Sequence, residues 1–233
     1  MGKLSTPDKI FIGIVLILVS IKLFDIIVSP NHIYPGRIAS FSWVEIVLVA
    51  ILGFMGLKLS ELTGFPAMWE PEISNKQRFL YPVLVGLGFG LIFMLFDSQA
   101  RIGDMSVGFP LSIMFYLFGG IFSEIVLHIF PVTFLILLIS NLALKKRFQD
   151  QVFWVAAIGI SLFGAFSMIM AFNDPNIPVQ ISSNYLMIVI SFLIFINELI
   201  SLYFFRIYGF LSPIVLRLSF YFMWHIIWPV VFY

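Results

Sequence analysis

Glu124 and His128 are the only acidic or basic side chains in the longest apolar stretch of the chain, residues 109–140. Residues four apart share one face of a helix, so these two side chains are predicted to lie next to each other. An ionisable group inside hydrocarbon is costly and is by default a candidate for function. A further histidine, His225, lies in the last apolar segment. A carboxylate and two imidazoles that meet can act as general acid and base, so these three are the candidate catalytic residues.

The composition of the 233 residues is typical of a membrane protein. Hydrophobic residues make up 61% of the chain and charged residues 11%, whereas a soluble domain has about 45–50% and about 25%. We therefore expect one all-α transmembrane domain that covers residues 1–233. The net charge of +1 without a basic patch argues against a nucleic-acid partner, and the absence of cysteine excludes thiolate nucleophiles and cysteine-ligated metals.

Seven segments are long and apolar enough to cross a membrane, because a span needs about 20 mainly apolar residues. They are residues 10–28, 43–59, 79–96, 109–140, 153–172, 186–205 and 211–231. The fourth is too long for one upright helix. It is expected to tilt, to continue beyond the bilayer, or to break at Pro131 or at Gly119-Gly120.

The distribution of lysine and arginine predicts the topology. Basic residues are frequent before the first span and after the second and fourth, and they are sparse after the first, third and fifth. Because positive charge stays on the cytoplasmic side, this alternation predicts seven crossings with the N-terminus in the cytoplasm and the C-terminus outside. Splitting the fourth span into two crossings would destroy the alternation.

Other charged residues also lie within the predicted spans. Lys22 and Asp25 are three apart near the outer end of the first span, and we expect them to pair there with the lysine reaching toward the headgroups. Glu198 and Arg217 lie in the middle of the sixth and seventh spans. Either they pair across helices, or one of them reaches the central site.

Glu124 and His128 have three further interpretations. They could form a local hydrogen bond that holds helices together, worth about 1 kcal/mol or less. They could bind zinc with His225, although the spacing E-x-x-x-H is not the zinc-binding H-E-x-x-H. Glu124 could also form a nucleophilic triad with Ser123 and either His128 or His225, but the adjacent residues Ser123 and Glu124 point about 100° apart on a helix, which is poor geometry for a triad.

Three segments together resemble the CAAX-protease and bacteriocin-processing family of intramembrane glutamic endopeptidases. Residues 123–128 (SEIVLH) are similar to the family motif Glu-Glu-x-x-x-Arg, and residues 163–167 (FGAFS) to its motif Phe-x-x-x-His. Residues 203–213 (YFFRIYGFLSP) and 225–229 (HIIWP) look like its third motif, an aromatic turn followed by a histidine and, four residues later, an asparagine. The resemblance covers about half of the chain. It implies a helical bundle in which the fourth, fifth and seventh spans line a polar cavity.

The chain departs from the family at the positions that would carry catalysis. In the family, the first glutamate and the second-motif histidine activate a water molecule, and here these positions hold Ser123 and Ser167. Pro229 replaces the asparagine that stabilises the oxyanion, and His128 replaces the arginine. Loss of one activating group typically lowers the rate by about 10²–10⁴. The resemblance therefore implies a catalytic set of which Glu124 and His225 remain.

Three functional hypotheses follow. The first is a non-catalytic scaffold or accessory subunit in the inner membrane of a bacterium or archaeon, with lipids and a membrane protein or peptide as partners and no cofactor or metal. Its binding cavity would be lined by Ser123, Phe163, Ser167, Glu198, Arg217 and Pro229. The second is an active endopeptidase that uses Glu124, His128 and His225. The third is an ion-coupled carrier that uses Glu124, Glu198 and His225, which the lack of an internal repeat disfavours.

Overall fold

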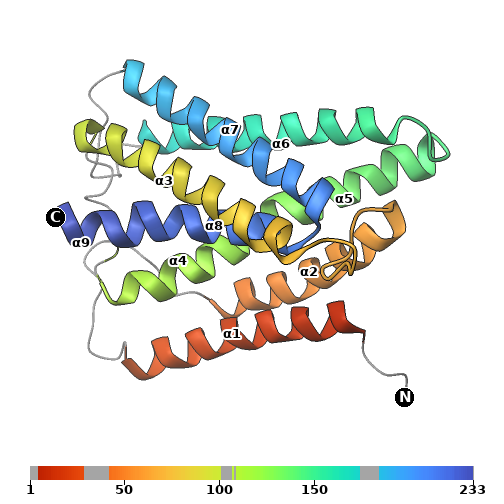
Figure 1. The fold of residues 1–233 in the computed structure, drawn as a ribbon, viewed down its shortest axis with the longest axis horizontal. Helices are drawn as coiled ribbons and strands as arrows, with labels where there is room; N and C mark the ends of the chain where they lie inside the picture. Colours follow the sequence, from red (N-terminus) through yellow and green to blue (C-terminus); the bar gives the residue numbers. More distant parts are fainter. Residues whose placement is uncertain (1–4, 29–41, 101–106, 108, 174–183, 233) are drawn as a thin grey trace.

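The computed structural model describes residues 5–28, 42–100, 107, 109–173 and 184–232. These residues form the all-α polytopic membrane protein that the composition predicts, without a strand among them (Figure 1). The elements are α1 (Thr6–Val28), α2 (Trp43–Thr63), α3 (Tyr81–Ala100), α4 (Leu111–Phe122), α5 (Phe130–Leu135), α6 (Gln149–Phe172), α7 (Asn184–Tyr208), α8 (Leu211–Tyr221) and α9 (Trp228–Phe232). Four π-helical stretches adjoin them: η2 (Lys76–Leu80), η4 (Ser123–Ile129), η5 (Ile136–Ala143) and η6 (Phe222–Ile227).

Seven helical runs of the described chain are long and apolar enough to cross a membrane, and each overlaps one predicted span. The fourth is the uninterrupted run Leu111–Ala143, built from α4, η4, α5 and η5. Neither Pro131 nor the Gly119-Gly120 pair breaks it into two crossings. α1 begins and α9 ends at opposite ends of the bundle, as an odd number of crossings requires (Figure 1). Which end faces the cytoplasm stays a prediction from the basic residues.

The helix α8 lies in the middle of the bundle (Figure 1). It packs along α3 on one side and along α7 and α4 on others. α2 packs against η4 and α5, with α1 outside it, and α6 packs against α7 and the last part of the fourth span. The inward faces of α8, η4 and α7 therefore meet in the centre, which is where the intramembrane charges lie.

Aromatic packing joins α3 to the C-terminal helices. The ring of Phe93 lies 4.9 Å from that of Phe220 and 4.8 Å from that of Trp224, measured between centroids. The indole N–H of Trp224 donates to the Asp97 carboxylate at 3.2 Å. A buried indole needs such a partner, so the hydrogen bond satisfies both groups without exposing either to lipid.

Proline explains three of the four π-helical stretches in the described chain. Pro82, Pro131 and Pro229 each lie two positions after the last π-helical residue of η2, η4 and η6. In each case the residue just before the proline donates its N–H to the carbonyl five residues back. A prolyl ring lacks the N–H and crowds the carbonyl four residues back, so the preceding turn widens. Such π-bulges are frequent at functional sites, and here η4 carries Glu124 and His128 while η6 carries His225.

The predicted pair within the first span is confirmed. Lys22 Nζ lies 2.9 Å from Asp25 Oδ2, and both side chains are largely buried. The pair neutralises two charges that would otherwise face the apolar surroundings of α1.

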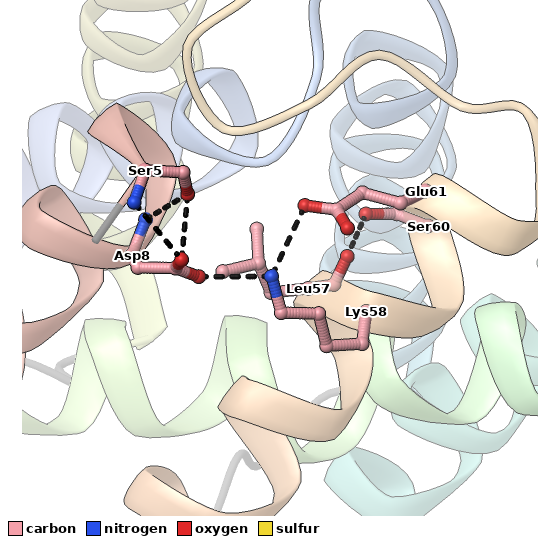
Figure 2. Close-up of polar contacts among 6 residues, drawn as sticks. All are labelled: Ser5, Asp8, Leu57, Lys58, Ser60 and Glu61. Carbon is pink, nitrogen blue, oxygen red and sulfur yellow. Dashed lines mark hydrogen bonds and ion pairs between the residues drawn. The ribbon is translucent and has the colours of Figure 1, made fainter. Parts of the chain in front are cut away.

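An ion-pair network joins the first turn of α1 to the last turns of α2. Lys58 Nζ lies 2.9 Å from Asp8 Oδ1 and 3.4 Å from Glu61 Oε1, and Figure 2 shows the lysine reaching between the two acids. Ser5 fixes the Asp8 carboxylate by donating its hydroxyl at 2.6 Å. The network therefore ties α1 to α2 at one end of the bundle.

Replacing Lys58 by methionine is expected to lower the free energy of unfolding by less than about 1 kcal/mol, because exposed ion pairs are screened by solvent. The Lys58 side chain is 37% exposed. Thermal unfolding in detergent micelles measures the effect. Lys9→Met is the control for the removal of one exposed positive charge, because Lys9 is exposed and follows Asp8 in the first turns of α1. If Lys58→Met lowered the free energy of unfolding by more than about 2 kcal/mol, these ion pairs would not be screened by solvent as expected.

Candidate functional site

A fully buried ion pair lies at the centre of the bundle. Arg217 of α8 donates its Nε–H to Glu124 Oε1 of η4 at 2.6 Å, and Ser201 of α7 donates its hydroxyl to Glu124 Oε2 at 3.1 Å. The Glu124 side chain has no exposed surface, and that of Arg217 is 6% exposed. Residues from three helical segments thus converge on one carboxylate, and Ser201 and Arg217 are 77 and 93 positions from Glu124 in the sequence. Hydrogen bonds between a guanidinium and a carboxylate are among the strong ones, so Arg217 and Ser201 hold the Glu124 side chain in place.

His128 lies between the two intramembrane glutamates. Its Nδ1 lies 3.0 Å from the Ser123 carbonyl oxygen and 3.9 Å from Glu124 Oε1, and its Nε2 lies 3.6 Å from Glu198 Oε1. A carbonyl oxygen only accepts, so Nδ1 carries a proton and donates it to Ser123. A separation of 3.9 Å is too long for a hydrogen bond. The local Glu124–His128 hydrogen bond considered from the sequence is therefore not formed.

Glu198 and Arg217 do not pair with each other as one sequence hypothesis held. Arg217 pairs with Glu124, and Glu198 lies against His128. The alternative hypothesis, that one of the two reaches the central site, holds for both of them. α7 and α8 pack against each other and both also contact η4, so a side chain from each of them reaches the polar residues of η4.

A cavity of about 1150 Å³ lies beside this charge cluster. Along α6 its lining runs from Gln151 to Ala171, which at 1.5 Å per residue is about 30 Å, close to the hydrocarbon thickness of a bilayer. Most lining side chains are apolar, and several of them, such as Leu127, Val155 and Phe163, are also exposed on the surface of the bundle. The open side of the cavity therefore faces lipid.

The structure places most of the predicted lining residues in this cavity. Ser123, Phe163, Ser167, Glu198 and Arg217 line it, together with His128 and His225. Pro229 is not among the lining residues, because it lies beyond the η6 turn that carries His225. Glu124 is not among them either, and its side chain has no exposed surface. Besides the fourth, fifth and seventh spans, the sixth span contributes Ile194 and the predicted Glu198 of α7 to the wall.

His225 does not meet Glu124. The described polar contacts of Glu124 are those with Arg217, Ser201 and His128. The His225 imidazole instead stacks on the Tyr116 ring, with centroids 4.1 Å apart and an interplanar angle of 3°, and lies beside Trp224. The predicted trio is thus replaced by a cluster in which Arg217, Ser201 and Glu198 surround Glu124 and His128.

The two serines of the cavity are bound to their own helices. The Ser123 hydroxyl donates to the Gly120 carbonyl at 3.2 Å, and the Ser167 hydroxyl donates to the Phe163 carbonyl at 2.7 Å. Neither hydroxyl therefore points at a base, so the Ser–His–Glu arrangement considered from the sequence is absent from the described residues. The described chain also holds no group of three or more histidine, cysteine, aspartate or glutamate residues arranged to bind a metal ion.

Two polar atoms of the site have no hydrogen-bond partner among the described residues, Glu198 Oε2 and Arg217 Nη2. Buried polar groups nearly always have partners, so these two atoms mark where a ligand or water would complete the site. Ser201 is not among the residues predicted from the sequence, although the sequence carries a signal for it: Ser201 lies three and four residues after Glu198 and Asn197, and the three form a polar patch within an apolar span.

Comparisons with models of protein families, with curated proteins and with solved structures found no match for this chain. The functional inference therefore rests on the chemistry of the site.

Proposed function

We propose that this protein is a non-catalytic scaffold or accessory subunit that binds a membrane partner, a peptide or a lipid in its intramembrane cavity. The observation that carries the proposal is the state of Glu124, the one acid retained from the family motif. Its carboxylate is fully buried and accepts hydrogen bonds from Arg217 and Ser201. The large cavity beside it is accessible from the lipid and lined mainly by apolar side chains, as ligand sites are.

Hydrolysis would require a general base within reach of a water molecule. Glu124 has no exposed surface and does not line the cavity. The two activating positions of the family hold Ser123 and Ser167, whose hydroxyls donate to carbonyls of their own helices. The resemblance to the CAAX-protease family then accounts for the cavity and the motif order, with catalysis lost. We further propose an inner membrane of a bacterium or archaeon as the location, with the N-terminus in the cytoplasm.

A tryptophan that fills the cavity tests the binding function. Gly159 lines the cavity, and a Cβ built on it meets nothing within 4 Å, so the side chain of Gly159→Trp begins in open space at the cavity wall and is expected to fill part of the cavity. We expect the stoichiometric partner, recovered from native membranes in mild detergent and identified by mass spectrometry, to be lost from this variant. Gly88→Trp is the matched control, since Gly88 also meets nothing within 4 Å but lies outside the cavity. Equal recovery from both variants would refute binding in the cavity.

A second candidate function is an active intramembrane endopeptidase, which one observation favours: Glu198 and His128 both line the cavity and lie 3.6 Å apart. This pair, rather than Glu124 with His225, would then supply the general base. The same recovery experiment with Glu198→Gln distinguishes the two functions. A peptide or protein that accumulates only on this variant would be a trapped substrate, whereas a partner recovered at equal stoichiometry from wild type and variant supports a scaffold.

A further inference from the structure

The two ends of the cavity differ in their chemistry. At the end where α6 begins, the lining side chains are aliphatic: Leu135, Ile139, Val152, Val155 and Ala156. At the end where α6 finishes, they are mostly aromatic: Tyr116, Phe220, Tyr221, Trp224 and His225. Met168, close to the last turn of α6, packs against the cluster that contains Phe220 and Trp224, which places these rings at that end. An occupant that fills the cavity therefore meets aliphatic groups along one part of its length and flat rings along another.

Polar side chains line the cavity between these two ends. They are Ser123, His128, Glu198 and Arg217. A purely hydrocarbon occupant would cover these groups without forming hydrogen bonds to them, which is costly. Arg217 has an acidic partner in Glu124 at 2.6 Å and also lies within electrostatic range of Glu198, so it does not need an anionic headgroup. The occupant is therefore expected to carry uncharged polar atoms part-way along its length.

Tyr221 joins the polar side chains to the aromatic end. Its ring lies 5.6 Å from that of Tyr116 and 5.2 Å from that of His225, measured between centroids, and it lies within electrostatic range of Arg217. The side chain is half-buried and lines the cavity, and its hydroxyl takes part in none of the hydrogen bonds of the described residues. A phenolic hydroxyl can donate and accept, so it is available to an oxygen atom of a ligand.

The dimensions of the cavity favour a slender occupant. A transmembrane helix about 10 Å wide and about 30 Å long fills about 2400 Å³, which is twice the volume of this cavity. A single hydrocarbon chain is much narrower than a helix and can be enclosed along its whole length. A phospholipid has such chains, but its polar headgroup lies at the bilayer surface rather than beside polar groups in the middle of the spans. A single-chain lipid with an uncharged polar ring fits both the shape and the lining.

We propose that the cavity binds a lipid-soluble quinone, that is, a flat uncharged ring that bears carbonyl oxygens and a long prenyl chain. The ring packs among the aromatic side chains of the cavity, since such rings stack in offset or edge-to-face arrangements. One carbonyl oxygen accepts the hydrogen bond of the Tyr221 hydroxyl, and the chain follows the aliphatic end. This inference rests on the proposed function, because it requires the cavity to be a binding site, and it specifies the kind of lipid that is bound.

Binding of decylubiquinone to the purified full-length protein in nanodiscs tests the proposal. Native mass spectrometry of protein released from the nanodiscs is expected to count one bound quinone per chain at saturation. Tyr221→Phe keeps the ring but removes the hydroxyl, so it is expected to weaken binding roughly twofold to tenfold, the effect of one hydrogen bond. Tyr203→Phe removes a hydroxyl outside the cavity and is expected to bind as the wild type does. Unchanged affinity in Tyr221→Phe, or equal affinity for decylbenzene, which lacks the ring oxygens, would overturn the proposal.

Two glycine variants separate this proposal from the cavity itself. Gly159→Trp, whose new side chain begins in open space at the cavity wall, is expected to abolish decylubiquinone binding, and Gly88→Trp, outside the cavity, is not. If decylubiquinone does not bind but a co-purified phospholipid or membrane protein is lost from Gly159→Trp, the quinone proposal fails and the cavity stands as a binding site. If Gly159→Trp changes the binding of none of them, the quinone proposal and the cavity as a binding site fail together.

Discussion

Replacing Arg217 by alanine is expected to destabilise the protein by about 3–5 kcal/mol, the cost of leaving a buried charge without its partner. Glu124 has no exposed surface, and its carboxylate oxygen lies 2.6 Å from Arg217 Nε. Without the guanidinium, the carboxylate keeps only the Ser201 hydroxyl and the nearby His128 as polar contacts. Unfolding of the purified variant in detergent, followed by circular dichroism against heat or added sodium dodecyl sulfate, measures the loss.

Two comparisons separate this effect from the loss of any arginine. Arg206→Ala removes an ion pair of similar length, 2.7 Å to Asp150, but the aspartate side chain is 74% exposed, so a loss below about 1 kcal/mol is expected. The double variant Glu124→Leu with Arg217→Met should recover most of the stability, because apolar residues of similar volume replace buried ion pairs without loss. A double variant that is as unstable as Arg217→Ala would show that the arginine acts through packing rather than through its charge.

Replacing Gly86 by alanine is expected to cost about 1–3 kcal/mol or more, because it forces apart two helices whose backbones touch. A Cβ at Gly86 would lie 2.9 Å from Ser219 Cβ and 3.0 Å from the Phe220 backbone nitrogen, and closer still to the Leu216 carbonyl oxygen. A backbone carbonyl cannot turn aside as the end of a long side chain can. Gly90, one turn along α3, faces Met223 Cβ in the same way, so the two glycines form the small-xxx-small pattern of closely packed membrane helices.

Gly88 is the matched control within the same helix. It lies between these two glycines, and a Cβ there meets nothing within 4 Å. Gly88→Ala is therefore expected to leave stability unchanged or to raise it by up to about 1 kcal/mol through helix propensity. If both substitutions had the same effect on unfolding in detergent, close packing of α3 on α8 would not be the cause.

Hydropathy was sufficient to predict the seven spans, because hydrocarbon selects strongly for length and apolarity whatever the helices pack against. The same reasoning identified Glu124, His128, Glu198 and Arg217 as residues of interest, since charge inside a span is rare for physical reasons. Their pairing was not predictable in this way. Which acid meets Arg217 depends on which helix is its neighbour, and spacing along one helix carries no information about the next.

Two features of the site were not predicted, although the sequence carries a signal for each of them. A proline placed within a span predicts a widened turn before it, and Pro82, Pro131 and Pro229 all behave in this way. The polar patch around Glu198 and Ser201 marks the face of the sixth span that turns inward. By contrast, the position of His225 against Tyr116 depends on how η6 is rotated, and no local pattern in the sequence sets that rotation.

The pairing of Glu124 with Arg217 also has a consequence for biosynthesis. The two residues are 93 positions apart, so at about 5–20 residues per second the arginine is synthesised roughly 5–20 s after the glutamate. During that interval the fourth span carries an acid whose counter-ion does not yet exist. A chain whose synthesis stops before α8 keeps this acid inside the bilayer without its counter-ion. An unpaired acid within the fourth span therefore distinguishes the incomplete chain from the finished protein.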